Sequence, residues 1–472
     1  MTGHRNRPAG RLERRATSRR ADCTVQFTGV GAAGCGDSSG EPAVDTETST
    51  SDEGGDTNGD ADANGNADTN GNADTNGDAD TNGDADTTGS NDTTSETTGD
   101  GDLDPMCSNG VFEPGEFCYE QVEAVETIAG GIGIAIADID QDGHLDFVLS
   151  GGPAGGPSVV PGDGAGGFGN PTHEFYEEII TPARVAVGAI AGGPPDVVVG
   201  SFWLGTSALY QGLGDGDLAL VPNGLDTSFG WGAALVDLDG DRLLDLVQSN
   251  QFGLVVHRGT DEGTLVWEAD IDYELGSAGG KTSGAWIDLA VGEVSGDAAV
   301  DVVVVDRYSG GLSVFHGTGD GSFAYATTLP TTDAPLSVAI GDLDGDLSPD
   351  FVACGSSVEI FLGGGGESTI TKLDGSLTTR CMLTDFDGDA IVDLVATRAT
   401  EGDESWVSFF RGNGDGTLQP PTTFALPAGL RAMDLAVGDF NEDGAPDFAM
   451  ATSATSESSP AETTPLVVLS HI

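Results

Sequence analysis

The sequence predicts an all-β fold: a seven-bladed β-propeller of four-stranded blades, preceded by a disordered acidic linker. Three observations predict it. A nine-residue acidic cassette recurs about every 50 residues, short apolar runs flank each copy, and residues 36–105 contain no Lys or Arg. A repeat of this period is typical of propellers and other repeat architectures, in which each unit needs its neighbours to bury its apolar surface.

Complete cassettes occupy residues 138–146, 237–245, 342–350, 385–393 and 439–447. Side-chain oxygens at positions 1, 3, 5 and 9 converge if the chain turns tightly, and the backbone carbonyl at position 7 can add another. Like charges about 4 Å apart repel by roughly 4 kcal/mol near a protein surface, and a divalent ion reverses that sign. Hard oxygen ligands suit calcium. The sequence therefore predicts Ca²⁺ as the cofactor, at about five sites.

The predicted ligands share these five positions and differ only in the residue type at some of them. They are Asp138, Asp140, Asp142, His144 and Asp146; Asp237, Asp239, Asp241, Leu243 and Asp245; Asp342, Asp344, Asp346, Ser348 and Asp350; Asp385, Asp387, Asp389, Ile391 and Asp393; and Asp439, Asn441, Asp443, Ala445 and Asp447. Asn441 offers an amide oxygen in place of a carboxylate.

The alternative to a metal site is a solvated acidic turn, because Asp, Asn and Gly are common turn residues. In-register copies between strand-like runs favour the metal. An EF-hand needs Glu at loop position 12, and the sequence excludes it because those positions hold Leu149, Gln248, Ala353, Ala396 and Met450.

Two further copies are degenerate. The copy from Glu293 to Asp301 keeps side-chain oxygens but loses charge, and its metal binding is left open. The second repeat keeps only Asp196, so no metal is expected there.

Four apolar runs per unit predict the strands of each blade. One run precedes the cassette (132–137), another follows it (147–149), a third ends in a glycine-rich turn (314–321), and a fourth comes after that turn (322–328). The last unit stops after three runs, at Leu469, whereas residues 120–128 form an extra run before the first unit. We expect this N-terminal run to complete the last blade and close the ring, because an open ring would leave an unpaired edge.

The segment Phe229-Gly230-Trp231-Gly232-Ala233-Ala234, ahead of Asp237, resembles the FG-GAP repeats of the integrin α-subunit propeller. The glycine-rich turns resemble the related bacterial VCBS repeats, and the resemblance covers roughly residues 119–472. It implies that the acidic loop joins the first two strands of a blade and binds calcium. It also implies a secreted, adhesion-type binding protein, although the sequence contains no Arg-Gly-Asp.

The expected organisation has four parts. Residues 1–35 form a signal or lipoprotein-type segment, 36–106 a disordered linker, 107–118 a Cys-bounded loop, and 119–472 the propeller. The linker composition cannot bury enough apolar surface to fold. Its Asp78, Asp80 and Asn82 have the spacing of a calcium array, but a flexible spacer is favoured because no apolar scaffold surrounds them.

Ala32-Ala33-Gly34-Cys35 resembles a bacterial lipobox, which implies a lipid anchor at Cys35 and an extracellular, cell-surface or outer-membrane location. No run of 18 apolar residues exists, so no transmembrane helix is expected. The segment from Cys107 to Cys118 resembles a Cys-rich module of secreted myxobacterial proteins, which implies a disulfide between these two residues. Cys354 and Cys381 either pair or remain buried thiols.

The formal charge of −61 argues against nucleic acid as a partner, because phosphate binding needs Lys and Arg. No hydrolase, zinc-protease or phosphate-loop motif is present. We expect a monomer that binds a protein or a glycan and is not an enzyme. The alternatives are a polysaccharide lyase or hydrolase and a passive scaffold. An exposed aromatic patch would favour the binding module, and the candidates for it are Trp203, Trp231, Trp267, Trp286 and Trp406.

Overall fold

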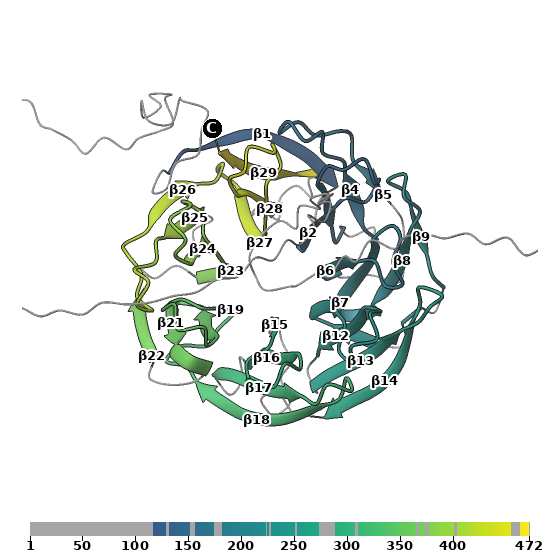
Figure 1. Cartoon of the computed structure of the whole chain (residues 1–472). Helices are drawn as coiled ribbons and strands as arrows, with labels where there is room; N and C mark the ends of the chain where they lie inside the picture. Colours follow the sequence, from purple (N-terminus) through teal and green to yellow (C-terminus); the bar gives the residue numbers. More distant parts are fainter. Residues whose placement is uncertain are drawn as a thin grey trace, which may run out of the picture. The chain divides into compact units, whose positions relative to one another are not determined.

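The computed structural model contains seven antiparallel sheets arranged around a central axis (Figure 1). It describes residues 117–128, 132–151, 156–173, 182–222, 224–225, 228–250, 253–272, 288–306, 310–364, 368–372, 377–400, 404–454 and 463–471. All of these belong to one compact unit, and the second unit, Cys35–Asp102, lies outside the described residues. The all-β seven-bladed propeller predicted from the sequence is confirmed.

Blades 1 to 6 each contain four strands in chain order from the axis outward, and one further short strand pairs in the sheet of blade 2 (Figure 1). Blade 1 comprises β2(Ile134–Ala137), β3(Asp146–Leu149), β4(Ser158–Val160) and β5(Thr172–His173). Blade 2 comprises β6(Pro182–Gly188), β7(Asp196–Thr206), β8(Ala208–Gly212) and β9(Leu218–Leu220). Blade 3 comprises β11(Gly232–Val236), β12(Asp245–Ser249), β13(Gly253–Gly259) and β14(Leu265–Asp272). Blade 4 comprises β15(Leu289–Gly292), β16(Asp301–Asp306), β17(Gly311–Gly317) and β18(Phe323–Pro330).

Blades 5 and 6 repeat the pattern. Blade 5 comprises β19(Ser337–Gly341), β20(Asp350–Cys354), β21(Ser357–Phe361) and β22(Ser368–Lys372), with the short 3₁₀ turn η1(Leu362–Gly364) after β21. Blade 6 comprises β23(Leu377–Thr384), β24(Asp393–Ala399), β25(Ser405–Phe410) and β26(Thr422–Ala425).

Blade 7 closes the ring with strands from both ends of the chain. β27(Leu430–Gly438), β28(Asp447–Ala454) and β29(Thr463–His471) come from the C-terminal end, and β1(Tyr119–Ile128) adds the outer strand. β1 pairs antiparallel with β29, from Tyr119 opposite His471 to Ile128 opposite Thr463. The closure expected from the extra N-terminal run is confirmed.

The hydrophobic core consists of seven clusters, one at each interface between neighbouring blades. In β16, Val302 and Val304 pack toward blade 3, whereas Val303 and Val305 pack toward blade 5. Successive strand residues point to opposite faces. Both faces of an inner sheet are therefore buried, which explains why these strands are continuous apolar runs rather than alternating ones.

The Phe229–Ala234 segment joins blades 2 and 3. β10(Ser228–Gly230) pairs with β7 of blade 2, and the chain then enters β11 of blade 3. Trp231 is buried in the cluster between blades 3 and 4. A Cβ atom at Gly230 would lie 2.1 Å from the Gln248 side chain, so a larger residue here would force that side chain of blade 3 to shift.

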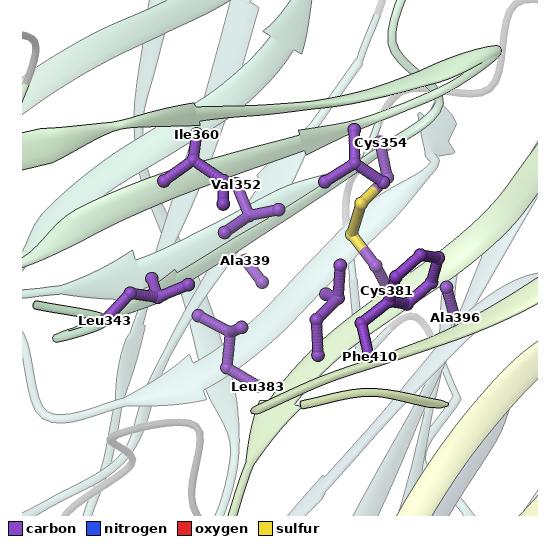
Figure 2. Packing of buried hydrophobic residues seen from close by; sticks show 11 residues of the cluster. Ala339, Leu343, Val352, Cys354, Ile360, Cys381, Leu383, Ala396 and Phe410 are labelled. Atoms are coloured by element: carbon purple, nitrogen blue, oxygen red, sulfur yellow. A yellow bond between two sulfur atoms is a disulfide. The ribbon is translucent and has the colours of Figure 1, made fainter. Parts of the chain in front are cut away.

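A disulfide between Cys354 of β20 and Cys381 of β23 links blade 5 to blade 6, with the two Cα atoms 6.4 Å apart. Figure 2 shows it within the apolar cluster formed by Val352, Ile360, Leu383 and their neighbours. The sequence left this pairing open, and the structure decides it. Cys118 is also disulfide-bonded, but Cys107 lies outside the described residues, so the Cys107–Cys118 bond stays a prediction.

Candidate metal centres

The acidic loops join the inner strand of a blade to its second strand, as the sequence predicted. In blades 1, 3, 5 and 6, the carboxylates at positions 1, 3 and 9 place oxygen atoms within 4.8 Å of one another. The groups are Asp138, Asp140 and Asp146; Asp237, Asp239 and Asp245; Asp342, Asp344 and Asp350; and Asp385, Asp387 and Asp393. Each could hold a metal ion. The blade 7 loop has the same turn, with Asn441 at position 3.

The carboxylate at position 9 organises the loop in every blade. Asp146 Oδ2 accepts a hydrogen bond from the position 2 amide of Ile139 (2.8 Å), and its Oδ1 accepts one from Gly162 at the end of the third strand (2.9 Å). Equivalent pairs of bonds occur at Asp196, Asp245, Asp301, Asp350, Asp393 and Asp447. Position 9 is therefore structural as well as a candidate ligand, which the sequence reading missed. The sequence does contain a signal for this structural role, because the degenerate cassettes of blades 2 and 4 keep the aspartate at position 9, as Asp196 and Asp301.

The carboxylate at position 5 shapes the turn. Asp142 Oδ1 accepts a hydrogen bond from the His144 amide at position 7 (2.9 Å), and Asp241, Asp346, Asp389 and Asp443 do the same in their loops. The three-carboxylate groups do not include position 5. The ligand roles of position 5 and of the carbonyl at position 7 stay predictions.

Burial raises the pKa of the position 9 carboxyls Asp146, Asp196, Asp245, Asp350 and Asp393, although backbone hydrogen bonds oppose the shift. The largest shift brings Asp393 to a pKa of about 7, with the Asp387 and Asp389 carboxylates adding to the effect of burial. Without a positive charge, these loops are therefore electrostatically unfavourable in the ionised form.

In blade 1, one carboxylate oxygen lacks any partner. Asp138 Oδ1 is buried and makes no hydrogen bond among the described residues. The equivalent Oδ1 atoms of Asp237, Asp342, Asp385 and Asp439 each accept at least one backbone N–H. A buried anionic oxygen without a partner costs free energy unless a cation compensates it.

The glycine-rich turn of the following blade packs against the acidic loops. The Gly416 amide of blade 6 donates to the Leu343 carbonyl of blade 5 (3.2 Å), and the Gly166 amide of blade 1 donates to the Phe440 carbonyl of blade 7 (3.3 Å). His144 Nδ1 also lies 2.6 Å from Glu442 Oε1, which links the loops of blades 1 and 7. An ion bound in one of these acidic loops would therefore also affect the contact between that blade and its neighbour.

Four charged side chains near the ring axis form an ionic quartet that no sequence motif indicated. Asp288 and Asp434 are buried, and Arg184 and Arg380 are half-buried. These residues come from blades 2, 4, 6 and 7, which can meet only at the centre of the ring. Arg380 Nε lies 3.2 Å from Asp434 Oδ1, and Arg380 and Arg184 also pair with Asp288 and Asp434, respectively. Burial alone would raise the pKa of Asp288, but Arg380 and Arg184 outweigh it and hold that pKa below its usual value.

The five tryptophans have different environments. Trp231 is buried, Trp406 is half-buried against the Arg398 guanidinium, and Trp267 is 48% exposed. Trp286 and the side chain of Trp203 lie outside what the structure describes. Tyr325 is 47% exposed on β18, and the strand registers place it at the position equivalent to Trp267 on β14 of the neighbouring blade.

Fold and loops together define a seven-bladed β-propeller whose blades carry acidic inner loops. The chain contains FG-GAP-like repeats: the model of the FG-GAP-like repeat family matches residues 294–353 and 385–450. These matches cover the acidic loops of blades 5 to 7 and the loop of blade 4 from residue 294 onward. Among the described residues, no helix is long and apolar enough to cross a membrane.

Several solved structures are similar in fold. A structure of BBS1N in complex with ARL6DN is 15% identical over 77% of this chain and 97% of that chain, with a TM-score of 0.50. An Agrocybe aegerita lectin that recognises non-reducing terminal N-acetylglucosamine is 18% identical over 63% and 80% of the two chains, with a TM-score of 0.44. At these identities the likeness concerns the fold alone. A comparison with curated protein sequences gives no match.

Proposed function

We propose that this protein is a calcium-stabilised propeller that acts outside the cell as a binding module for a protein or a glycan. The observation that carries the calcium proposal is Asp138 Oδ1, buried without a hydrogen-bond partner beside Asp140 and Asp146. A hard divalent cation is the partner that an all-oxygen carboxylate site selects. Calcium would be held by the loop carboxylates and would neutralise their mutual repulsion.

Thermal unfolding of the full chain with excess calcium and with a chelator, together with metal content, tests this proposal. Calcium should raise the melting temperature, because one site at a concentration of about 100 Kd stabilises by about 2.7 kcal/mol. The D138N variant should lose one ion and part of this gain. D215N removes the same charge from an exposed turn and should bind as many ions as the wild type. An identical melting temperature with calcium and chelator would refute the proposal.

The location outside the cell is supported by the Cys354–Cys381 disulfide, because such bonds persist in oxidising compartments. The lipid anchor proposed at Cys35 lies outside the described residues. Extracellular fluid is also the compartment in which weak calcium sites are filled.

The binding role is supported by Trp267 and Tyr325, two exposed aromatic side chains at equivalent positions of neighbouring blades. Such side chains offer a large apolar face and a polar tip, and they are enriched at binding interfaces. We propose that the binding surface lies on the outer strands of blades 3 and 4. Binding, and not catalysis, would be its activity.

A glycan array and a polysaccharide degradation panel separate these roles. The wild type should bind at least one glycan and degrade none, and W267A/Y325A should bind it at least about tenfold more weakly. Undiminished binding by W267A/Y325A would mean that Trp267 and Tyr325 are not part of the binding surface. Degradation of any polysaccharide would support the enzyme alternative.

A further inference from the structure

One position differs between blades whose acidic loops are otherwise alike: the residue opposite position 9 on the third strand. The strand registers assign this position to Pro161, Gln211, Arg258, His316, Leu362, Arg411 and Ser470. Its side chain borders the acidic loop, so its charge decides how much of the carboxylate repulsion the protein itself neutralises.

In two of the four three-carboxylate loops, this residue is arginine. Arg258 Nη1 lies 3.0 Å from Asp239 Oδ2 and 3.1 Å from Asp245 Oδ2. Arg411 Nε lies 2.7 Å from Asp387 Oδ2. Both guanidinium groups therefore occupy carboxylate oxygens at position 3, which belong to the candidate metal groups.

In the other two loops, the residue is Pro161 or Leu362, which brings no charge. Within the described part of the chain, no Lys or Arg pairs with Asp138, Asp140, Asp342 or Asp344. Blade 2 lacks loop carboxylates at the other positions and has an uncharged Gln211 there. Arginine thus occurs only beside full carboxylate groups.

We propose that Arg258 and Arg411 are built-in counter-cations that divide the four three-carboxylate loops into two classes. The loops of blades 1 and 5 are open to calcium and bind it tightly. The loops of blades 3 and 6 are neutralised by the protein and bind calcium at least about tenfold more weakly, because the ion must displace a guanidinium or approach a like charge. This inference rests on the proposed calcium binding.

The two arginines differ in how firmly they are held. Arg258 also donates through Nη2 to the Asp320 carbonyl in the glycine-rich turn of blade 4, and its side chain is 18% exposed. The Arg411 side chain is 36% exposed. Blade 3 should therefore resist calcium more strongly than blade 6.

Calcium titration of the full chain by calorimetry, with ions counted by native mass spectrometry, tests the proposal. R258L and R411L introduce the residue that blade 5 carries, and each should add one tight calcium site. Q211L introduces leucine at the same position of blade 2, whose loop keeps only Asp196, and should leave the ion count unchanged. The reverse variant, L362R, should lose one tight site while keeping the wild-type melting temperature in chelator.

Equal affinities at all wild-type sites, unchanged in R258L and R411L, would overturn this inference and leave the calcium proposal standing. No calcium on the wild type or on R258L/R411L would instead overturn the calcium proposal, and this inference with it. If L362R unfolds in chelator, the ion counts of R258L and R411L still test whether the arginines weaken calcium binding, because these variants remove a charge without enlarging a side chain.

Discussion

At the scale of single residues, six acidic loops hold two residues each in the left-handed backbone conformation, at positions 4 and 6. In each loop one of the two is glycine and the other is not. The non-glycine residues are Gln141, Arg242, Ala298, Leu347, Ala390 and Glu442. This conformation costs a side chain roughly 1–2 kcal/mol. Such strain persists where the surrounding structure or function imposes the backbone, which agrees with loops shaped for an ion.

Replacement of Leu347 by glycine should stabilise the protein by about 1 kcal/mol. Leu347 has a φ of 69° and is 91% exposed, so glycine relieves strain and little burial is lost. Urea unfolding at saturating calcium measures the change. Leu213 is exposed but has no positive φ, so L213G should destabilise. A loss of stability in L347G as well would contradict the assignment of strain.

The raised pKa of Asp393 predicts how pH acts on the chelated protein. Its folded-state pKa of about 7 lies above the ordinary value of 3.8, so protonated Asp393 favours the folded state. That contribution is complete below about pH 4 and is lost as the pH rises to about 7. In chelator, the free energy of unfolding should fall over this window, and D393N should reduce the slope. A D393N profile parallel to the wild type would argue against the shift.

At the scale of the element, one carboxylate ties three segments of each blade together. The position 9 oxygens accept from the acidic loop and from the end of the third strand, and the residue itself begins the second strand. Blade 2 keeps this arrangement around Asp196 although its loop lacks the other carboxylates. Position 9 is therefore required by the blade whether or not an ion is bound.

The D196A variant should lose about 2–3 kcal/mol of stability, because two buried N–H groups lose their acceptor. The loss should be the same with calcium and with chelator. D138A should behave differently and lose stability chiefly in calcium. Denaturant unfolding under both conditions separates the two roles. If the D196A loss depended on calcium, position 9 of blade 2 would be a metal ligand after all.

At the scale of the whole molecule, three long-range contacts add to the seven apolar clusters between blades: the β1–β29 pairing, the interblade disulfide and the axial ionic quartet. The quartet need not stabilise more than an apolar centre would, since desolvation offsets the attraction of buried charges. It does require opposite charges from four blades to meet. We therefore expect it to favour one arrangement of the blades.

Breaking the quartet on one side should be costly. R380M leaves Asp288 and Asp434 with Arg184 as their remaining cation, and the expected loss is about 3–5 kcal/mol. R431M removes an equal charge from a half-buried position of β27 and should cost less than about 1 kcal/mol. Unfolding of both variants in denaturant measures the difference. Equal losses of stability in R380M and R431M would mean that the ionic quartet contributes no more to folding than a single half-buried arginine does.

The propeller, its blade number and the closing strand could be predicted because each depends on a local pattern repeated along the chain. The same holds for the position of the acidic loops between the first two strands, and for the carboxylates at positions 1, 3 and 9 that gather in four of them. A cassette of this kind brings its own carboxylates together within nine residues. Local sequence is sufficient to place them.

The contacts between blades follow from the packing of the whole chain and could not be predicted from the sequence. Arg380 and Asp288 are 92 positions apart, and no pattern along the chain pairs them. The approach of Arg258 to its acidic loop and the choice of Cys381 as the partner of Cys354 likewise follow from strand register and blade packing. The sequence by itself therefore determined what each blade contains. Packing of the blades around a common axis determined which loop carboxylates an arginine of the protein neutralises and which have no such partner among the described residues.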